Sequence, residues 1–216
     1  MKILAVGAHP DDIEIGCAAT LALFKRKGYE VYFLVLTRGE ASGDPKIREI
    51  ECIESAGIIG ADKIYFGNLE DTKITDGIET ITEIENVINL VRPDILFVHS
   101  PRDTHQDHRN TSLAAMSAGR KLRNILLYES PAALREFCPQ IFVDVESAFG
   151  LKMEALRRFN SQSSKNFYED LSRHDADETM LPIINAMEGL ARFRGFQIGV
   201  RIAEAFEVGR FVLEIQ

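Results

Sequence analysis

Short apolar runs alternate with amphipathic segments along the first two-thirds of this 216-residue chain, and this alternation constrains the fold more than any other feature. The apolar runs predict strands and the amphipathic segments predict helices, which is the pattern of a parallel sheet built from strand–helix units. Strands this uniformly apolar are expected when helices cover both sheet faces. The predicted strands are 2–8, 30–37, 63–67, 94–100 and 124–129, and the predicted helices are 16–28, 45–59, 77–91 and 107–121.

We therefore expect one α/β domain over residues 1–216, with a Rossmann-like, doubly wound and mostly parallel sheet. The expected strand order is 3-2-1-4-5, with helices on both faces. The C-terminal third is expected to be helical, with helices near 147–159 and 166–192. A polar loop is expected at 160–166, and the tail "IAEAFEVGRFVLEI" is compatible with a helix or a strand.

Composition excludes several classes of protein. The chain has 25 basic and 33 acidic residues, so its net charge of -8 lacks the basic surface of a nucleic-acid binder. No apolar run approaches the 18 residues of a membrane span, and the first one is too short for a signal peptide. Cys17, Cys52 and Cys138 form no C-x-x-C pair, which argues against a disulfide framework. A cytoplasmic location is expected.

The stretch "AHPDDIEIG" (8–16) directly follows the first predicted strand, where open parallel sheets place their ligand sites. It offers an imidazole and carboxylates instead of the glycines that a dinucleotide would need. His9 and Asp12 are of the ligand types that bind first-row metals, and Pro10 restricts the backbone between them. Because neighbouring side chains in a turn diverge, one of Asp11 and Asp12 is expected to bind the metal. The other is expected to act as a general base on the metal-bound water.

A second cluster, "HSPRDTHQDHRN" (99–110), follows the fourth predicted strand. His105 and His108 are three residues apart and share a face at a helix start. In the expected strand order, strands one and four are neighbours, so the two clusters flank one crevice. Two histidines and one aspartate leave coordination positions open, as in catalytic zinc sites and in non-haem iron oxygenases. The clusters also contain a spare aspartate and a spare histidine. These could act as the base and the acid of hydrolysis, whereas an oxygenase has no obvious need of them, so the pattern favours a hydrolase over an oxygenase.

These paired motifs resemble those of the LmbE-like or PIG-L-like deacetylases, which are zinc-dependent hydrolases acting on N-acetylglucosamine-type sugars. The resemblance rests on "AHPDD" with Glu14 after it, and on "HQDH". It extends along most of the chain and so implies a single LmbE-like deacetylase domain. Weaker elements are "TRGE" (37–40), Arg48 with Glu51, "YESP" (128–131), and Ser161 with Gln162.

The resemblance implies that His9, Asp12 and His108 ligate Zn²⁺. Fe²⁺ or Co²⁺ would suit the same ligands. It also implies that Asp11 is the general base. The implied substrate is a small N-acetylated sugar conjugate, and a homo-oligomer is compatible with the resemblance.

It further implies that His105 stabilises the developing oxyanion and protonates the leaving amine, with Asp107 orienting its ring. Arg48 and Arg109 would hold sugar hydroxyls or an anionic group. Some members of the family carry a tyrosine just before the H-x-D-H motif, thought to assist the oxyanion. This chain has Asp103 there, so a tyrosine contribution is not expected.

Structural alternatives compete with these roles. Asp11 could cap the following helix, and Glu14 could complement the helix dipole. Arg48 could form a surface ion pair with Glu51. His99, which ends a strand, could be a ligand or a core residue. The alternative functions are hydrolysis of a phosphoester or another amide, and sugar binding without catalysis.

Overall fold

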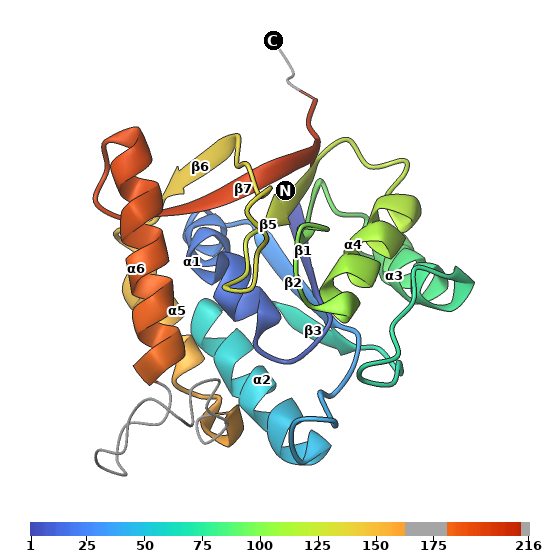
Figure 1. Ribbon diagram of the computed structural model, residues 1–216. Helices are drawn as coiled ribbons and strands as arrows, with labels where there is room; N and C mark the ends of the chain where they lie inside the picture. Colours follow the sequence, from blue (N-terminus) through green and yellow to red (C-terminus); the bar gives the residue numbers. More distant parts are fainter. Residues whose placement is uncertain (163–180, 213–216) are drawn as a thin grey trace.

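The computed structural model describes residues 1–162 and 181–212, and Figure 1 shows how their helices and strands are arranged. Every strand and helix predicted in the first two-thirds is present, with ends shifted by a few residues. The strands are β1 (Lys2–Gly7), β2 (Glu30–Val35), β3 (Lys63–Phe66), β4 (Ile95–His99), β5 (Ile125–Tyr128), β6 (Ile141–Asp144) and β7 (Ala203–Arg210). The helices are α1 (Asp12–Arg26), α2 (Pro45–Ile59), α3 (Ile78–Val91), α4 (Gln106–Ala118), α5 (Phe149–Leu156) and α6 (Leu181–Ile198), with a 3₁₀ turn η1 (Asn160–Gln162).

The strands form one sheet in the order β3-β2-β1-β4-β5-β7-β6. The first five run parallel in the expected order 3-2-1-4-5. Strand β7 pairs antiparallel with both β5 and β6. Because β1 lies between β2 and β4, the chain reverses its winding direction there, and the loops after β1 and β4 lie side by side.

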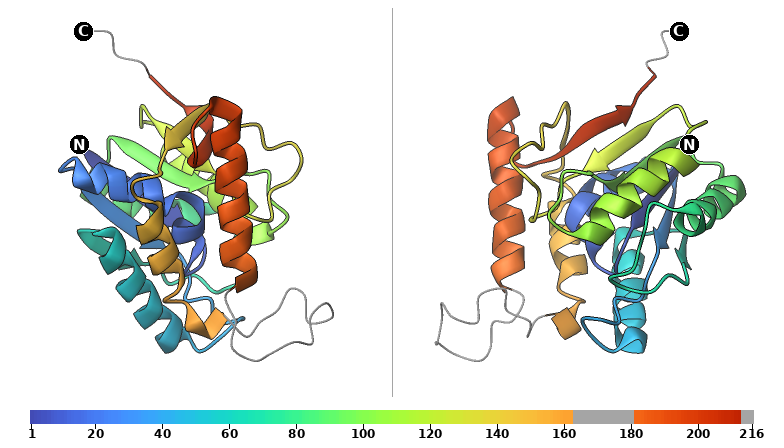
Figure 2. Two further views of the ribbon diagram at one scale, coloured as in Figure 1. Left: turned by 90° about the vertical axis from the view of Figure 1, so that its left-hand side faces the viewer. Right: turned by 45° about the vertical axis from the view of Figure 1, so that its right-hand side comes forward.

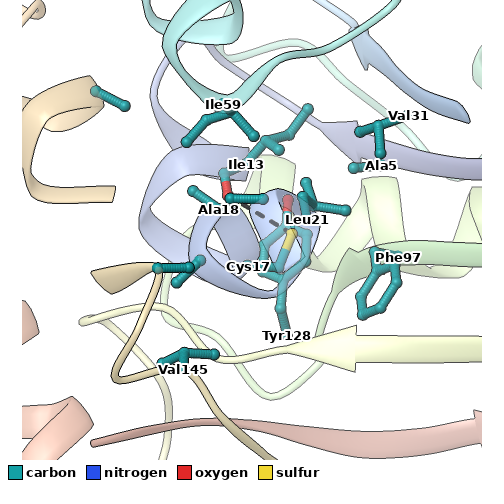
Figure 3. Packing of buried hydrophobic residues seen from close by; sticks show 14 of the residues in the cluster. Ala5, Ile13, Cys17, Ala18, Leu21, Val31, Ile59, Phe97, Tyr128 and Val145 are labelled. Atoms are coloured by element: carbon teal, nitrogen blue, oxygen red, sulfur yellow. Dashed lines mark hydrogen bonds between the residues drawn. The ribbon is translucent and has the colours of Figure 1, made fainter. Parts of the chain in front are cut away.

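Helices cover both faces of this sheet (Figure 1, Figure 2), and alternate strand residues fill two separate cores. Ile3 and Ala5 of β1 face the core beneath α1, α2, α5 and α6. Leu4 and Val6 face the core beneath α3 and α4. Figure 3 shows part of the first core, where Cys17 and its neighbours on α1 lie close to the sheet.

A glycine permits the close packing of α1 on the sheet. A Cβ added to Gly16 would lie 2.1 Å from Cδ2 of Tyr128, so only glycine fits at this contact without movement. The Tyr128 hydroxyl then donates a hydrogen bond of 2.8 Å to the Val6 carbonyl. These contacts fix helix α1 beside the carboxyl end of β1. The first residues of α1 thereby lie at the edge of the sheet where the candidate active site is found.

The C-terminal third differs in part from the expectation. Helices α5 and α6 are present, but this region also contributes β6, which was not predicted, and β7, which resolves the ambiguous tail as a strand. Two buried glutamates, Glu204 and Glu207, interrupt the apolar pattern of β7 and so conceal its strand signal. The predicted helix at 166–192 and the polar loop at 160–166 fall partly on residues 163–180, which lie outside the described residues.

In the part of the chain that the structure describes, no helix has the length and apolar character needed to cross a membrane.

Candidate active site

The turn between β1 and α1 separates the two adjacent aspartates. Asp11 has a φ of 108°, in the left-handed region that is costly for a residue with a Cβ. Its side chain makes no capping hydrogen bond to α1, so the capping alternative is wrong. The Asp12 carboxylate instead turns back and accepts a 2.7 Å hydrogen bond from the backbone N–H of His9. The two carboxylates therefore occupy different positions, as the turn argument expected.

The start of α4 brings the second cluster to the same edge. His105 immediately precedes the helix, and its Nδ1 accepts a hydrogen bond of 3.2 Å from the backbone N–H of Asp107. The His105 backbone N–H in turn donates to Asp103 Oδ1 at 2.7 Å. The His105 side chain remains exposed, whereas His108, one turn further on, is buried.

The two clusters meet in space. The ring centroids of His9 and His108 are 5.5 Å apart, and those of His9 and His105 are 4.9 Å apart. His108 Nε2 lies 3.2 Å from Asp12 Oδ1, and His9 Nδ1 lies 3.4 Å from Asp12 Oδ2. These spacings bring the three predicted ligands together.

Three overlapping groups of side chains have ligand atoms close enough to hold a metal ion. None of these groups contains His9, Asp12 and His108 together, but each group shares a histidine with another, so the groups adjoin one another. The donor set of imidazole nitrogens and carboxylate oxygens suits a first-row divalent cation. The groups are His9 with His105 and His108; Asp12 with His99 and His108; and His9 with Asp71 and Asp107.

His108 is held on both sides. Its Nδ1 lies 3.0 Å from Asp103 Oδ2, which also accepts a hydrogen bond from the Ser130 hydroxyl, and its Nε2 faces Asp12. Burial would lower the pKa of His108, but Asp12 and Asp103 raise it to about 9. The negative charge of these two carboxylates can be balanced by a proton on His108 or, equally, by a bound cation. Asp103 thus orients a predicted ligand, as carboxylates commonly do for metal-bound histidines.

His9 contacts a different pair of carboxylates. Its Nε2 lies 3.0 Å from Asp71 Oδ1 and 3.2 Å from Asp107 Oδ2. The Asp107 carboxylate, expected to orient His105, therefore lies against His9 and also accepts a hydrogen bond of 2.8 Å from the Thr72 amide. Its other oxygen, Oδ1, is buried without a partner among the described residues. An unsatisfied buried carboxylate oxygen is consistent with a cation-binding role.

Asp71 was missed by the sequence analysis. It lies in the loop after β3, the third strand, where it directly follows Glu70, and this loop carries no histidine that would mark the two carboxylates as part of a metal site. The Ala41 amide donates to its Oδ2 at 3.0 Å, which fixes the carboxylate beside His9. The one available signal was its position after a predicted strand at the functional edge of the sheet.

His99 contacts two of the predicted ligands, His108 and Asp12. Its ring stacks on His108 with centroids 4.0 Å apart and planes 12° apart, and its Nε2 lies 3.1 Å from Asp12 Oδ2. Burial lowers the pKa of His99 to about 4, with a further decrease from His108. The His99 ring is therefore neutral at pH 7, and its contacts hold the side chains of His108 and Asp12 in place.

Asp11 has the environment of a proton acceptor. Its side chain is 20% exposed and lies 3.5 Å from an Arg48 nitrogen. Burial raises the pKa of Asp11 to about 7, Arg48 opposes this rise, and Asp12 adds to it. A carboxyl group with a pKa near the working pH is suited to general-base catalysis. A cation bound beside it would shift this pKa downward.

Arg48 is buried, and its hydrogen bonds hold two loops of the candidate active site together. Its guanidinium donates to the carbonyls of Pro10 at 2.7 Å and Gly39 at 2.9 Å. Gly39 has a φ of 67°, and a Cβ there would lie 1.9 Å from Arg48 Nη1. Glu51 instead accepts hydrogen bonds from the backbone and side chain of Ser161. The surface ion pair between Arg48 and Glu51 is therefore wrong.

Arg109 likewise binds backbone. Its guanidinium donates to the carbonyls of Asp103 at 2.8 Å and Thr104 at 2.7 Å, which shapes the loop before α4. Both arginines thus have structural partners, and their contact with substrate stays a prediction.

Glu14 does not complement the helix dipole at the surface. It is only 1% exposed and accepts a hydrogen bond of 2.9 Å from the Ser55 hydroxyl. Burial raises the pKa of Glu14 to about 8, so the side chain is mainly neutral at pH 7. A neutral carboxyl group offers no charge to the helix N-terminus.

The fold and these side chains define an α/β protein with a candidate metal centre at the carboxyl edge of its sheet. Residues 4–119 match the model of the PIG-L family, described as GlcNAc-PI de-N-acetylase. The chain belongs to this family of deacetylases, and the matched segment includes every side chain of the three metal-binding groups.

Individual relatives agree with this assignment. The chain is 36% identical over 167 residues to the uncharacterized deacetylase YaiS of Escherichia coli K12, covering 74% of this chain and 90% of YaiS. It is 28% identical over 193 residues to the diacetylchitobiose deacetylase of Thermococcus kodakarensis, covering 78% of this chain and 72% of that protein. The solved structure of the N,N′-diacetylchitobiose deacetylase of Pyrococcus horikoshii superposes with a TM-score of 0.82 at 25% identity, covering 96% of this chain and 83% of that one.

Proposed function

We propose that this protein is a zinc-dependent N-deacetylase that hydrolyses the acetamide of an N-acetylglucosamine-type sugar conjugate in the cytoplasm. The observation that carries the proposal is the convergence of His9, Asp12 and His108, with Asp11 left beside them. The family and the names of the relatives from Thermococcus and Pyrococcus support deacetylation as the reaction. A small N-acetylated sugar conjugate is the proposed substrate.

His9, Asp12 and His108 would hold the metal, with Zn²⁺ proposed and Fe²⁺ or Co²⁺ as substitutes. A bound divalent cation polarises a carbonyl group and increases the acidity of water. Asp103 and His99 keep His108 and Asp12 in place before any ligand arrives. This preorganisation avoids the cost of reorganising the donors during the reaction.

The chain itself supplies the proton transfers. Asp11 accepts the proton of the attacking water, and Arg48 holds the turn that carries this carboxylate. His105 is exposed at the start of α4, where its ring can reach substrate. Burial and the neighbouring rings of His108 and His9 lower the pKa of His105, which makes its protonated form a stronger acid. That form donates a proton to the leaving amine nitrogen.

The test is a direct assay of both products. Zinc-loaded protein is incubated with N-acetylglucosamine conjugates and, separately, with a generic phosphoester, and the assay measures free amine, acetate and phosphate. The proposal expects amine and acetate in equal amounts and no phosphate. Phosphate release without amine would replace the proposal with phosphoester hydrolysis. Sugar binding without either product would indicate a non-catalytic relative.

A further inference from the structure

Helix α6 carries a buried arginine on the side that faces the sheet. The helix lies on the outer side of the molecule, next to β7 (Figure 2). Met187, Ala191 and Arg194 are buried, and their spacing places them on one face of the helix. Met187 and Ala191 belong to the apolar core, whereas Arg194 brings a charge to the same face. Because arginine is rarely buried without a partner, the partner of Arg194 indicates what its burial supports.

The partner is Glu129, in the turn that follows β5. Arg194 Nε donates a hydrogen bond of 2.8 Å to Glu129 Oε2, and Arg194 Nη2 donates to Glu129 Oε1. Both side chains are 11% exposed. The Phe137 and Phe193 rings lie close to the guanidinium, with their centres 5.5 Å and 5.3 Å from its Cζ. A two-point ion pair with so little exposure fixes the orientation of the turn relative to α6.

The next residue in this turn reaches the candidate metal centre. Ser130 directly follows Glu129, and Pro131 restricts Ser130 to extended backbone conformations. The Ser130 hydroxyl donates a hydrogen bond to Asp103 Oδ2, the oxygen that lies 3.0 Å from His108 Nδ1. Because Glu129 and Ser130 are adjacent in the chain, anchoring the first limits the movement of the second.

Backbone hydrogen bonds join the same turn to the loop before α4. The Thr104 amide donates to the Ala132 carbonyl at 3.1 Å, and the Leu134 amide donates to the Arg102 carbonyl at 2.9 Å. The Ala132 amide also donates to Ser130 Oγ at 3.1 Å. The two loops therefore form one hydrogen-bonded unit, which contacts α6 through Glu129 and precedes the helix that carries His108.

We propose that Arg194 is a positioning residue for the metal centre, which acts on His108 through the turn after β5. The inference rests on the proposed role of His108 as a ligand. It adds a support from the C-terminal helix, outside the residues 4–119 that match the family model. Partners that orient a metal-binding histidine commonly change metal affinity while the ligands stay the same. The docking of α6 and the binding of the cation are therefore energetically coupled.

The closing experiment measures zinc affinity by competition with a chelator. Arg194→Met removes the ion pair, and we expect zinc affinity to fall roughly 3- to 10-fold. At saturating zinc, the activity should approach that of the wild type, because the ligands are unchanged. Arg194→Lys keeps the charge but lacks the planar group that binds both oxygens of Glu129, so a smaller fall is expected. This milder variant decides the test if Arg194→Met does not fold.

Two controls separate positioning from general effects. Arg192→Met makes the same substitution on the exposed side of α6 and should leave zinc affinity unchanged. Lys152→Met breaks the buried pair of Lys152 and Glu204, which lines the same small cavity as Arg194. It should lower the free energy of unfolding without changing zinc affinity. An equal fall in zinc affinity in Lys152→Met would overturn the proposal, because destabilisation alone would then explain the result.

A double-mutant cycle tests the route from Arg194 to the centre. Ser130→Ala removes the hydroxyl group that binds Asp103 and should lower zinc affinity by a similar factor. If Arg194 acts through Ser130, adding Arg194→Met to Ser130→Ala should have little further effect. Two effects that multiply would show that the residues act separately and would overturn the proposal. Unchanged zinc affinity in both Arg194 variants would overturn it as well.

Amide hydrogen exchange in the metal-free protein separates this proposal from the proposed function. The amides of Thr104 and His105 are hydrogen-bonded in the loop before α4. Both should exchange faster in Arg194→Met than in the wild type, and Lys152→Met should leave them unchanged. If the wild type binds no zinc, the proposed function fails. Faster exchange would still support the link between α6 and this loop, and unaltered exchange would contradict it.

Discussion

The two halves of the candidate active site are built differently. The half that would hold the metal is buried, with His9, Asp12 and His108 between 5% and 9% exposed, and each contacts at least two polar groups. The half that would transfer protons is more open, since His105 is exposed and the Asp11 side chain is 20% exposed. The contrast indicates that cation binding requires a fixed arrangement, whereas proton transfer requires access to substrate and water.

The largest effect is expected from removing a ligand on the buried side. His108→Ala leaves Asp12 and Asp103 facing each other without the imidazole between them, so the metal should be lost. We expect activity at background and no stoichiometric zinc by elemental analysis of the dialysed protein. A variant that keeps one zinc per chain would show that His108 is not a ligand.

A smaller effect is expected on the open side. Asp11→Asn keeps the shape of the side chain but removes the proton acceptor, so kcat should fall by about 10²- to 10⁴-fold. Zinc content should match that of the wild type, because the substitution leaves the ligands intact. Loss of zinc from this variant would erase the distinction between the two halves.

The residues behind His108 should affect metal binding more weakly than the ligand itself. Asp103→Asn should weaken zinc affinity by about 10- to 100-fold, as is typical when the partner of a metal-bound histidine changes. Competition with a chelator measures this change, and Ser117→Ala on the exposed side of α4 serves as the control. Unchanged affinity in Asp103→Asn would mean that the Asp103 contact does not support metal binding.

The smallest effect on chemistry is expected far from the centre, at the buried ion pair of Lys152 and Glu204. Their charged atoms are 2.7 Å apart, and Glu204 also accepts hydrogen bonds from the α1 amides of Ala19 and Thr20. Lys152→Met leaves a buried carboxylate unpaired and should lower the free energy of unfolding by about 3–5 kcal/mol, with little change in kcat.

Urea denaturation measures this loss, and the exposed pair of Arg192 and Glu188 on α6 provides the comparison. Arg192→Met should cost no more than about 1 kcal/mol. Equal losses in the two variants would show that burial does not distinguish these pairs.

Much of the fold and the meeting of the two clusters could be predicted from sequence. Apolar runs identified the first five strands, and the rule that ligands bind where strand order reverses placed His9 and His108 at one edge. Strand β6 was not predicted, and the segment of β7 was ambiguous because buried glutamates disrupt its apolar pattern. Those carboxylates are satisfied by residues distant in sequence, such as Lys152 and Ser100.

The supporting contacts of the site were less accessible to sequence reasoning. Asp71 Oδ1 lies 3.0 Å from His9 Nε2, and only the position of Asp71 after a predicted strand pointed to this contact. The spacing of Arg48 and Glu51 matches a surface pair, but the loops around Gly39 bury Arg48 and redirect it to backbone carbonyls. Motifs therefore identified the ligand types, while the pairing between them depended on tertiary structure.

The most direct test of this account is zinc X-ray absorption spectroscopy on the wild type and on His105→Ala. His105 lies close enough to His9 and His108 to be a ligand itself, so its removal separates the two possible ligand sets. The account predicts one zinc with two imidazole ligands in both proteins, and an activity loss in His105→Ala alone. Loss of one imidazole from the zinc environment of His105→Ala would contradict the division between metal-binding and proton-transferring residues.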